Sequence, residues 1–200
     1  MTVQALRERV RFLTGTPGTP ALLCITGASG AGKTTAVGAL RDTIEARLLP
    51  TLFFDSLGVP PIDHMHAGWE SPRGWQKAMT WFWVQTAKNV YRTHPLVVLE
   101  GSFDPQYAIA ACSANRMRHA VVLLHAEMPV LKERLDQRGQ PELATDDMAS
   151  WASYLHETTP QLGGHVIDAA GTVAATVDAI CTRALALLAE APVERPRRSN

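Results

Sequence analysis

The sequence predicts an α/β protein in which a parallel, five-stranded sheet lies between two layers of helices. Short, continuously apolar segments alternate with longer segments of helical periodicity, which is typical of a parallel sheet covered on both faces. A glycine-rich loop directly follows the first apolar segment. Ligands of such sheets bind at the carboxyl ends of the strands, so the residues after each strand are the functional candidates. Strands are expected at residues 21–25, 51–54, 96–99, 120–124 and 166–167.

The segments between these strands predict the helical layers. Residues 1–20 are expected to form a helix over 3–13, apolar on one face, and a turn-rich connector. Residues 56–72 contain three prolines and are interpreted as a functional loop. Residues 191–200 are expected to be a flexible tail. Further helices are expected from the glycine-rich loop to about Leu48, over 73–93, over 129–138 and over 172–190.

Composition limits the class of protein. Two hundred residues suit one domain, and contents of 46% hydrophobic and 19% charged residues are typical of a soluble globular protein. The formal net charge of 0 favours neither nucleic acid nor an anionic membrane as a partner, and no apolar run approaches the roughly 18 residues of a membrane span. Cys24, Cys112 and Cys181 lie far apart in apolar surroundings, which indicates buried thiols of a cytoplasmic protein. Monomer and homodimer both remain open.

Residues 27–34, GASGAGKT, match the phosphate-binding pattern G-x-x-x-x-G-K-[ST]. Glycines allow a backbone path whose N–H groups form a nest for phosphate oxygens at the positive end of the following helix. Lys33 is expected to reach the β- and γ-phosphates, and the Thr34 hydroxyl to bind Mg²⁺. A merely flexible turn is the alternative, but the strand before it and the helix after it disfavour that interpretation. The predicted nucleotide-binding residues are Gly27, Ala28, Ser29, Gly30, Ala31, Gly32, Lys33, Thr34 and Thr35.

Acidic residues end two of the predicted strands. Asp55 closes TLFFD and Glu100 closes LVVLE. A carboxylate at either place can coordinate Mg²⁺, directly or through water, or accept a proton from an attacking hydroxyl. A helix cap or a solvated strand end is the alternative, and for Asp55 the following Ser56 makes capping a fair competitor.

Five segments together resemble the P-loop kinases, the group that contains uridine kinase, gluconate kinase, shikimate kinase and the nucleoside monophosphate kinases. ITGASGAGKTT resembles their first strand and phosphate loop, and FFDS resembles the strand whose aspartate meets the acceptor hydroxyl in uridine kinases. VVLEG resembles the acidic end of their third strand, and LKERLDQRGQ resembles their basic lid. HVIDAAGTVAATVDAI resembles the final strand and the helix beside the adenine. The resemblance covers residues 21–188 in order, with the phosphate loop as its most specific motif.

This resemblance implies a P-loop three-layer sandwich over residues 21–190, with an acceptor region at about 56–94 and a helical lid at about 129–148. It implies ATP and Mg²⁺ as cofactors. It also implies that Asp55 is the catalytic base and that Lys33 contacts the phosphates. The residues expected at the metal are Thr34, Asp55 and Glu100.

Two arginines in the lid segment are candidates for stabilising the transferred group. Arg134 and Arg138 are four residues apart and therefore share one helical face. Two guanidiniums there can neutralise charge on the transferred phosphoryl group. The alternative is a solvated face on which they pair with Glu133 and Asp136.

The segment 63–75 is rich in groups that recognise a polar small molecule. Asp63, His64 and Arg73 can hydrogen-bond an acceptor, and Trp69 and Trp75 can supply flat apolar walls. Binding of a metal by the histidines of this segment is a weak alternative, because further ligands are lacking. A lone arginine does not establish an anionic acceptor. With the two strand-end carboxylates, the expected acceptor-binding residues are Asp55, Asp63, His64, Arg73 and Glu100.

The leading functional prediction is ATP-dependent phosphoryl transfer to a hydroxyl of a small-molecule partner, such as a nucleoside, a sugar or a hydroxylated natural product, antibiotics included. A nucleoside monophosphate kinase is an alternative, but it would need more basic residues than Arg73 at the acceptor phosphate. A regulatory ATPase or GTPase is a second alternative. Guanine is usually read by Asn-Lys-x-Asp, and none of the three asparagines begins that motif.

Overall fold

The computed structural model describes residues 2–190 of the chain. Its centre is a five-stranded, all-parallel sheet with the strand order β2-β3-β1-β4-β5. This confirms the predicted α/β class with a five-stranded parallel sheet. The predicted tail at 191–200 lies outside the described residues. The strands are β1 (Ala21–Thr26), β2 (Thr51–Phe53), β3 (Leu96–Glu100), β4 (His119–His125) and β5 (His165–Asp168).

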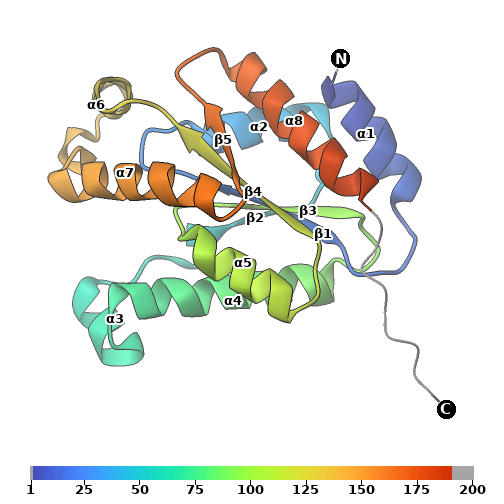
Figure 1. The fold of residues 1–200 in the computed structure, drawn as a ribbon, viewed down its shortest axis with the longest axis horizontal. Coiled ribbons are helices and arrows are strands. Elements are labelled where there is room, and N and C mark those ends of the chain that lie inside the picture. The colour runs from blue at the N-terminus through green and yellow to red at the C-terminus, as the bar shows by residue number, and fades with distance from the viewer. Residues whose placement is uncertain (1, 191–200) are drawn as a thin grey trace.

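Helices cover both faces of the sheet (Figure 1). One layer contains α1 (Thr2–Leu13), α2 (Lys33–Thr43) and α8 (Val173–Ala189), and the other contains α3 (Ile62–Trp69), α4 (Pro72–Val90) and α5 (Pro105–Ala114). Within residues 2–190, no helix is both long and apolar enough to cross a bilayer. The remaining elements are α6 (Met128–Gln137), α7 (Asp146–Gln161) and two 3₁₀ turns, η1 (Phe54–Leu57) and η2 (Pro141–Leu143).

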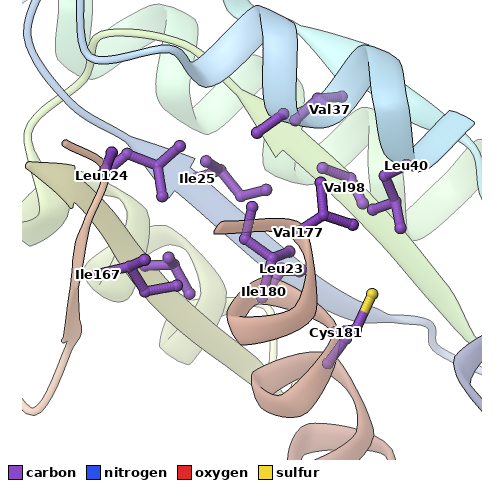
Figure 2. Close-up of a cluster of buried hydrophobic side chains, with 14 of the residues drawn as sticks. Leu23, Ile25, Val37, Leu40, Val98, Leu124, Ile167, Val177, Ile180 and Cys181 are labelled. Atoms are coloured by element: carbon purple, nitrogen blue, oxygen red, sulfur yellow. The ribbon is translucent and has the colours of Figure 1, made fainter. Parts of the chain in front are cut away.

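The sheet separates two hydrophobic cores, because alternate residues of each strand point to opposite faces. On β1, Leu23 and Ile25 pack with residues of α2 and α8 (Figure 2), whereas Leu22 and Cys24 pack with residues of α4 and α5. All six residues of β1 are buried. The strand is apolar from Ala21 to Ile25, and it carries the phosphate loop from the centre of the sheet.

The strand register brings the predicted functional residues to one edge of the sheet. In β3, Glu100 lies opposite Ile25 of β1 on one side and opposite Phe53 of β2 on the other. The residues that follow these two strands are the phosphate loop and η1, which contains Asp55. The carboxyl ends of three adjacent strands thus place the loop, Asp55 and Glu100 at the same edge.

Three predicted boundaries are wrong. Helix α2 ends at Thr43 rather than near Leu48, because Ile44 turns to an extended conformation (φ −112°, ψ 117°) and is fully buried. Strand β2 ends at Phe53, so Asp55 lies in a 3₁₀ turn and not in the strand. The predicted loop 56–72 contains α3, which begins after Pro61 and buries only Met65. An almost fully exposed helix has no apolar stripe, and periodicity could not reveal it.

Two further helices had no counterpart in the prediction. Helix α5 begins after the cap residue Asp104, whose side chain accepts a hydrogen bond from the backbone N–H of Gln106 (2.8 Å). Helix α7 begins after Thr145, whose hydroxyl accepts one from the N–H of Met148 (3.2 Å). Both starts have capping signals in the sequence. The two helices matter for function because they flank the turn that follows Glu100.

Candidate functional site

The phosphate loop joins β1 to α2 and is tightly enclosed by its neighbours. A Cβ atom at Gly27 would lie 2.5 Å from the carbonyl oxygen of Leu124 in β4. Gly30 has φ +81°, and a Cβ there would lie 2.9 Å from the carbonyl oxygen of Leu131 in α6. Glycine is therefore needed at Gly27 for close approach, and at Gly30 for both approach and backbone conformation. The loop fits between β4 and α6 only without side chains at these two positions.

Lys33 is directed into its own loop. Its ammonium donates hydrogen bonds to the carbonyl oxygens of Gly27 (2.8 Å) and Ala28 (3.0 Å). Burial lowers the pKa of Lys33, and the nearby carboxylates of Glu100 and Asp55 oppose that shift. A half-buried ammonium tied to carbonyl oxygens of the phosphate loop is positioned to meet phosphate oxygens there.

Glu100 and Thr34 form the oxygen-rich part of the site. The Glu100 side chain is 5% exposed, and the Thr34 hydroxyl donates to its Oε1 over 3.4 Å. Burial raises the pKa of Glu100, while Lys33 and the Thr34 bond lower it. Among residues 2–190, no group of three or more His, Cys, Asp or Glu side chains could hold a metal ion. A hydroxyl and one carboxylate suit Mg²⁺, which takes its other ligands from phosphates and water.

Asp55 is held in place by the aromatic residue before it. Phe54 is buried between Trp75 and Phe103, with ring centroids 5.7 Å and 5.6 Å away. Its carbonyl oxygen accepts a hydrogen bond from the Trp83 indole (3.0 Å). The Asp55 side chain itself is exposed; partial burial raises its pKa and the charge of Lys33 opposes the rise. The packing of Phe54 thus fixes the backbone at Asp55, while the Asp55 carboxylate stays open to solvent.

The turn after β3 links Asp55 to Glu100. A Cβ at Gly101 would overlap the Cβ of Phe54, so the backbone after Glu100 packs directly on the residue before Asp55. Two residues later, the Phe103 carbonyl accepts from the Thr26 hydroxyl (2.7 Å), which in turn accepts from the Phe103 N–H (3.2 Å). The turn therefore ties the backbone after Glu100 to the backbone before Asp55 and to the end of β1.

An open pocket of about 220 Å³ lies beside the phosphate loop, away from the carboxylates. Arg134 forms part of its wall, donating to the carbonyl oxygens of Ala169 (2.6 Å) and Gly30 (3.5 Å). Arg138 also lines the pocket but its side chain is exposed. The two predicted lid arginines thus reach the same pocket in different states, one tied to backbone carbonyls and the other exposed. The lining residues are Gly30, Ala31, Gly32, Thr35, Ala36, Arg134, Gln137, Arg138, Ala169, Gly171, Val173 and Thr176.

Solved structures of other proteins resemble this chain in its fold. No protein-family model matches the chain, and no curated protein matches it. Among solved structures, a gluconokinase from Sinorhizobium meliloti 1021 superimposes with a TM-score of 0.55 at 22% identity, over 86% of this chain and 93% of the other. A shikimate kinase from Acinetobacter baumannii in complex with shikimate gives 0.54 at 15% identity, over 88% and 97%. A sugar kinase from Janibacter sp. HTCC2649 gives 0.52 at 18% identity, over 86% and 96%.

The chain has the fold of P-loop small-molecule kinases. The resemblance that the sequence indicated is confirmed at this level. At 15–22% identity the superpositions carry the fold and leave the acceptor to be inferred from this chain's own residues.

On the acceptor side of this kinase fold, the predicted residues are scattered over a solvent-facing surface. Asp63 and His64 are exposed on α3, and Arg73 is exposed at the start of α4. Trp75 is buried against Phe54 as part of the core, whereas Trp69 at the end of α3 is 38% exposed. The structure therefore leaves Trp69 free as an apolar wall, while Trp75 packs behind η1.

Sequence analysis missed a polar network between α7 and the turn after Glu100. The Trp151 indole donates to the Ser102 hydroxyl (3.0 Å), and the Tyr154 hydroxyl donates to Oδ2 of Asp104 (2.9 Å). From α4, Gln76 donates to the Ser102 carbonyl (3.2 Å) and accepts from the Asp104 N–H (3.1 Å). Two features of the sequence indicate this part of the site: the capping residue Thr145, and the aromatic residues Trp151 and Tyr154, which lie one helical turn apart.

Proposed function

We propose that this protein is an ATP-dependent kinase that transfers the γ-phosphoryl group to a hydroxyl of a small molecule. The observation that carries the proposal is the convergence of the phosphate loop, Asp55 and Glu100 at one edge of the sheet, with Lys33 close to both carboxylates. A phosphate cradle alone is compatible with hydrolysis. A solvent-open carboxylate fixed beside it supports transfer to a second substrate, because it offers a base to an attacking hydroxyl.

The pocket beside the phosphate loop is where we place the nucleoside of ATP. Its wall includes the Arg134 guanidinium, a flat cation held at two points that can stack on a purine. No carboxylate lines this pocket, and Asp168 at the end of β5 uses its side chain to accept from the N–H of Ala170 (2.8 Å). Guanine presents N–H donors that favour a carboxylate partner, so the lining supports ATP over GTP.

The reaction requires little covalent participation by the protein. The acceptor oxygen forms a bond to the γ-phosphorus as the bond from that phosphorus to the β–γ bridging oxygen breaks, and ADP leaves. Asp55 takes the proton of the acceptor hydroxyl. Lys33 and the loop N–H groups stabilise phosphate charge, and Arg138, which is exposed at the pocket, approaches the transferred group. Thr34 and Glu100 would hold Mg²⁺, which when bound would neutralise charge on the phosphates.

The proposal is tested by measuring ADP release from Mg²⁺-ATP in the presence of nucleosides, sugars and hydroxylated natural products. We expect ADP release that depends on at least one acceptor, with one phosphorylated product per ADP formed. Hydrolysis that no acceptor stimulates would contradict the proposal and favour a regulatory ATPase. A parallel titration with GTP tests the assignment of ATP.

A further inference from the structure

The chain leaving Asp55 exposes three large aliphatic side chains in succession. Leu57 is 62% exposed, Val59 is 55% exposed and Ile62 is 66% exposed. Leu57 belongs to the same 3₁₀ turn as Asp55, so this apolar rim begins within the candidate site. Exposed aliphatic side chains beside a functional site indicate a surface that can contact the apolar part of a ligand.

Two aromatic side chains of α7, here called the aromatic wall, lie at the turn that follows Glu100, and Trp151 also packs partly against the hydrophobic core. Trp151 and Tyr154 stack with ring centroids 5.4 Å apart and an interplanar angle of 20°, and both are half-buried. Their hydrogen bonds to Ser102 and Asp104 hold them against the turn that follows Glu100.

The same turn connects the rim and the wall. Its Gly101 packs on Phe54, the residue before Asp55, and its next residue, Ser102, bonds Trp151. Helices α3 and α7 lie at the same end of the molecule, on opposite sides of the sheet edge (Figure 1). The rim and the aromatic side chains are thus both linked to the backbone at Asp55 through this one turn.

Charge on this side opposes an anionic acceptor. Residues 55–73 carry three carboxylates and one guanidinium, and the guanidinium of Arg73 is exposed to water. Within this stretch an acidic acceptor would meet three carboxylates and one solvated cation, and Lys33, close to Asp55, is assigned to the phosphates of ATP. An uncharged acceptor avoids the repulsion from these carboxylates. The carboxylates are those of Asp55, Asp63 and Glu70.

We propose that the acceptor is an uncharged alcohol with a sizeable apolar or aromatic body, which packs between the rim of Leu57, Val59 and Ile62 and the Trp151 indole. This inference rests on the proposed kinase function and names the substrate class of its acceptor site. Polar interactions near Asp55 orient the hydroxyl, and burial of the apolar body supplies most of the acceptor's affinity.

Three compounds with the same hydroxyls at C2, C3 and C4 of one sugar ring separate the contributions of apolar area and charge: phenyl glucoside, glucose and phenyl glucuronide. We measure kcat/KM for acceptor-dependent ADP formation with each, and the dissociation constant of each from the ADP-bound protein by tryptophan fluorescence. Phenyl glucoside should exceed glucose roughly tenfold or more in affinity, as expected for burial of a phenyl ring, and should exceed phenyl glucuronide. The inference is overturned if phenyl glucoside binds no more tightly than glucose, or no more tightly than phenyl glucuronide. This holds whether or not any of the three compounds is phosphorylated.

Leu57→Ser combined with Ile62→Ser should remove most of the preference for phenyl glucoside over glucose, while leaving the affinity for ATP unchanged. Val90→Ser is the matched control, because Val90 is 65% exposed at the far end of α4. An unchanged preference in the double variant overturns the inference, as does a change only in oligomeric state. Faster phosphoryl transfer to glucose or to phenyl glucuronide than to phenyl glucoside would refute the apolar acceptor and leave the kinase function standing. Hydrolysis of ATP without transfer to any acceptor would refute the kinase function itself.

Discussion

Substitution of Gly101 by alanine tests whether the turn after β3 sets the position of Asp55 relative to Glu100. The added methyl group would overlap the Cβ of Phe54 and lie 3.1 Å from its Cγ and 3.5 Å from Cδ1 of Phe103. No positive φ is involved at Gly101, so the conflict is one of space alone. Both ring neighbours are fully buried and have no room to withdraw.

The size of the effect follows from that overlap. Carbon atoms pack at about 3.5–4.0 Å, so Phe54 must move by at least about 1 Å to accept the methyl group. Overpacking of this kind costs about 1–3 kcal/mol, which for a chain of this length lowers Tm by roughly 2–12 °C. Because Phe54 precedes Asp55, the carboxylate moves with it, and a misplacement of about 1 Å lowers kcat by about 10²-fold.

The assay combines a thermal melt with the kcat of acceptor-dependent ADP formation at saturating ATP. Gly38→Ala is the matched control, since Gly38 lies within α2 and a Cβ there meets nothing within 4 Å. That control should be stabilised by about 0.5–1 kcal/mol with unchanged kcat. A Gly101→Ala protein with the Tm and kcat of the parent would refute the idea that this turn couples the two carboxylates.

Three other substitutions separate the roles assigned to the site. Lys33→Ala should abolish transfer with an unchanged circular dichroism spectrum, because the ammonium bonds only its own loop; near-normal turnover in the folded variant would contradict the phosphate-loop assignment. Arg134→Ala should mainly raise the KM for ATP, since Arg134 anchors the pocket wall, whereas Arg138→Ala should mainly lower kcat; the reverse pattern would exchange their roles. Burial raises the pKa of Glu100, so the folded state binds this proton more tightly than the unfolded chain and stability falls as pH rises through the raised pKa. Glu100→Gln should therefore gain Tm relative to the parent as pH rises above the ordinary Glu pKa of about 4.3, and a difference in Tm that stays constant with pH would contradict a raised pKa.

The parts of the site that depend on local sequence could be predicted. Eight consecutive residues specify the phosphate loop, because glycine conformation, the lysine and the following helix all act within one turn of chain. The strands could also be predicted, since a strand buried on both faces is a nearly continuous apolar run, as β1 is from Ala21 to Ile25. The placement of Asp55 and Glu100 at one edge could be predicted because the carboxyl ends of parallel strands share that edge, and their roles stay predictions.

The parts that depend on distant contacts could not be predicted. Trp151 and Ser102 are 49 residues apart, and Tyr154 and Asp104 are 50 apart, so no local pattern announces their hydrogen bonds. The overlap of Gly101 with Phe54 is equally non-local. Arg134 was predicted to stabilise the transferred phosphoryl group, and its hydrogen bond to Ala169, a residue that follows β5, had no local signal in the sequence.

The assignment of Asp55 as base is tested most directly by comparing Asp55→Asn with Glu100→Gln. We expect Asp55→Asn to bind ATP like the parent and to transfer phosphate about 10²–10⁴-fold more slowly, because an amide cannot take the hydroxyl proton. Partial burial raises the pKa of Asp55, so the acid limb of the parent's kcat profile should lie above that of a free aspartate and vanish in this variant. Recovery at high Mg²⁺ is expected for Glu100→Gln and not for Asp55→Asn.

The measurement itself follows label from the γ-phosphorus of ATP into the acceptor and into inorganic phosphate for the parent and both variants, with a thermal melt of each. The account predicts label on the acceptor in the parent and almost none in folded Asp55→Asn with intact ATP binding. Label that reaches only inorganic phosphate in the parent would contradict the kinase function, and transfer that survives in Asp55→Asn but is lost in Glu100→Gln would contradict the assignment of the base.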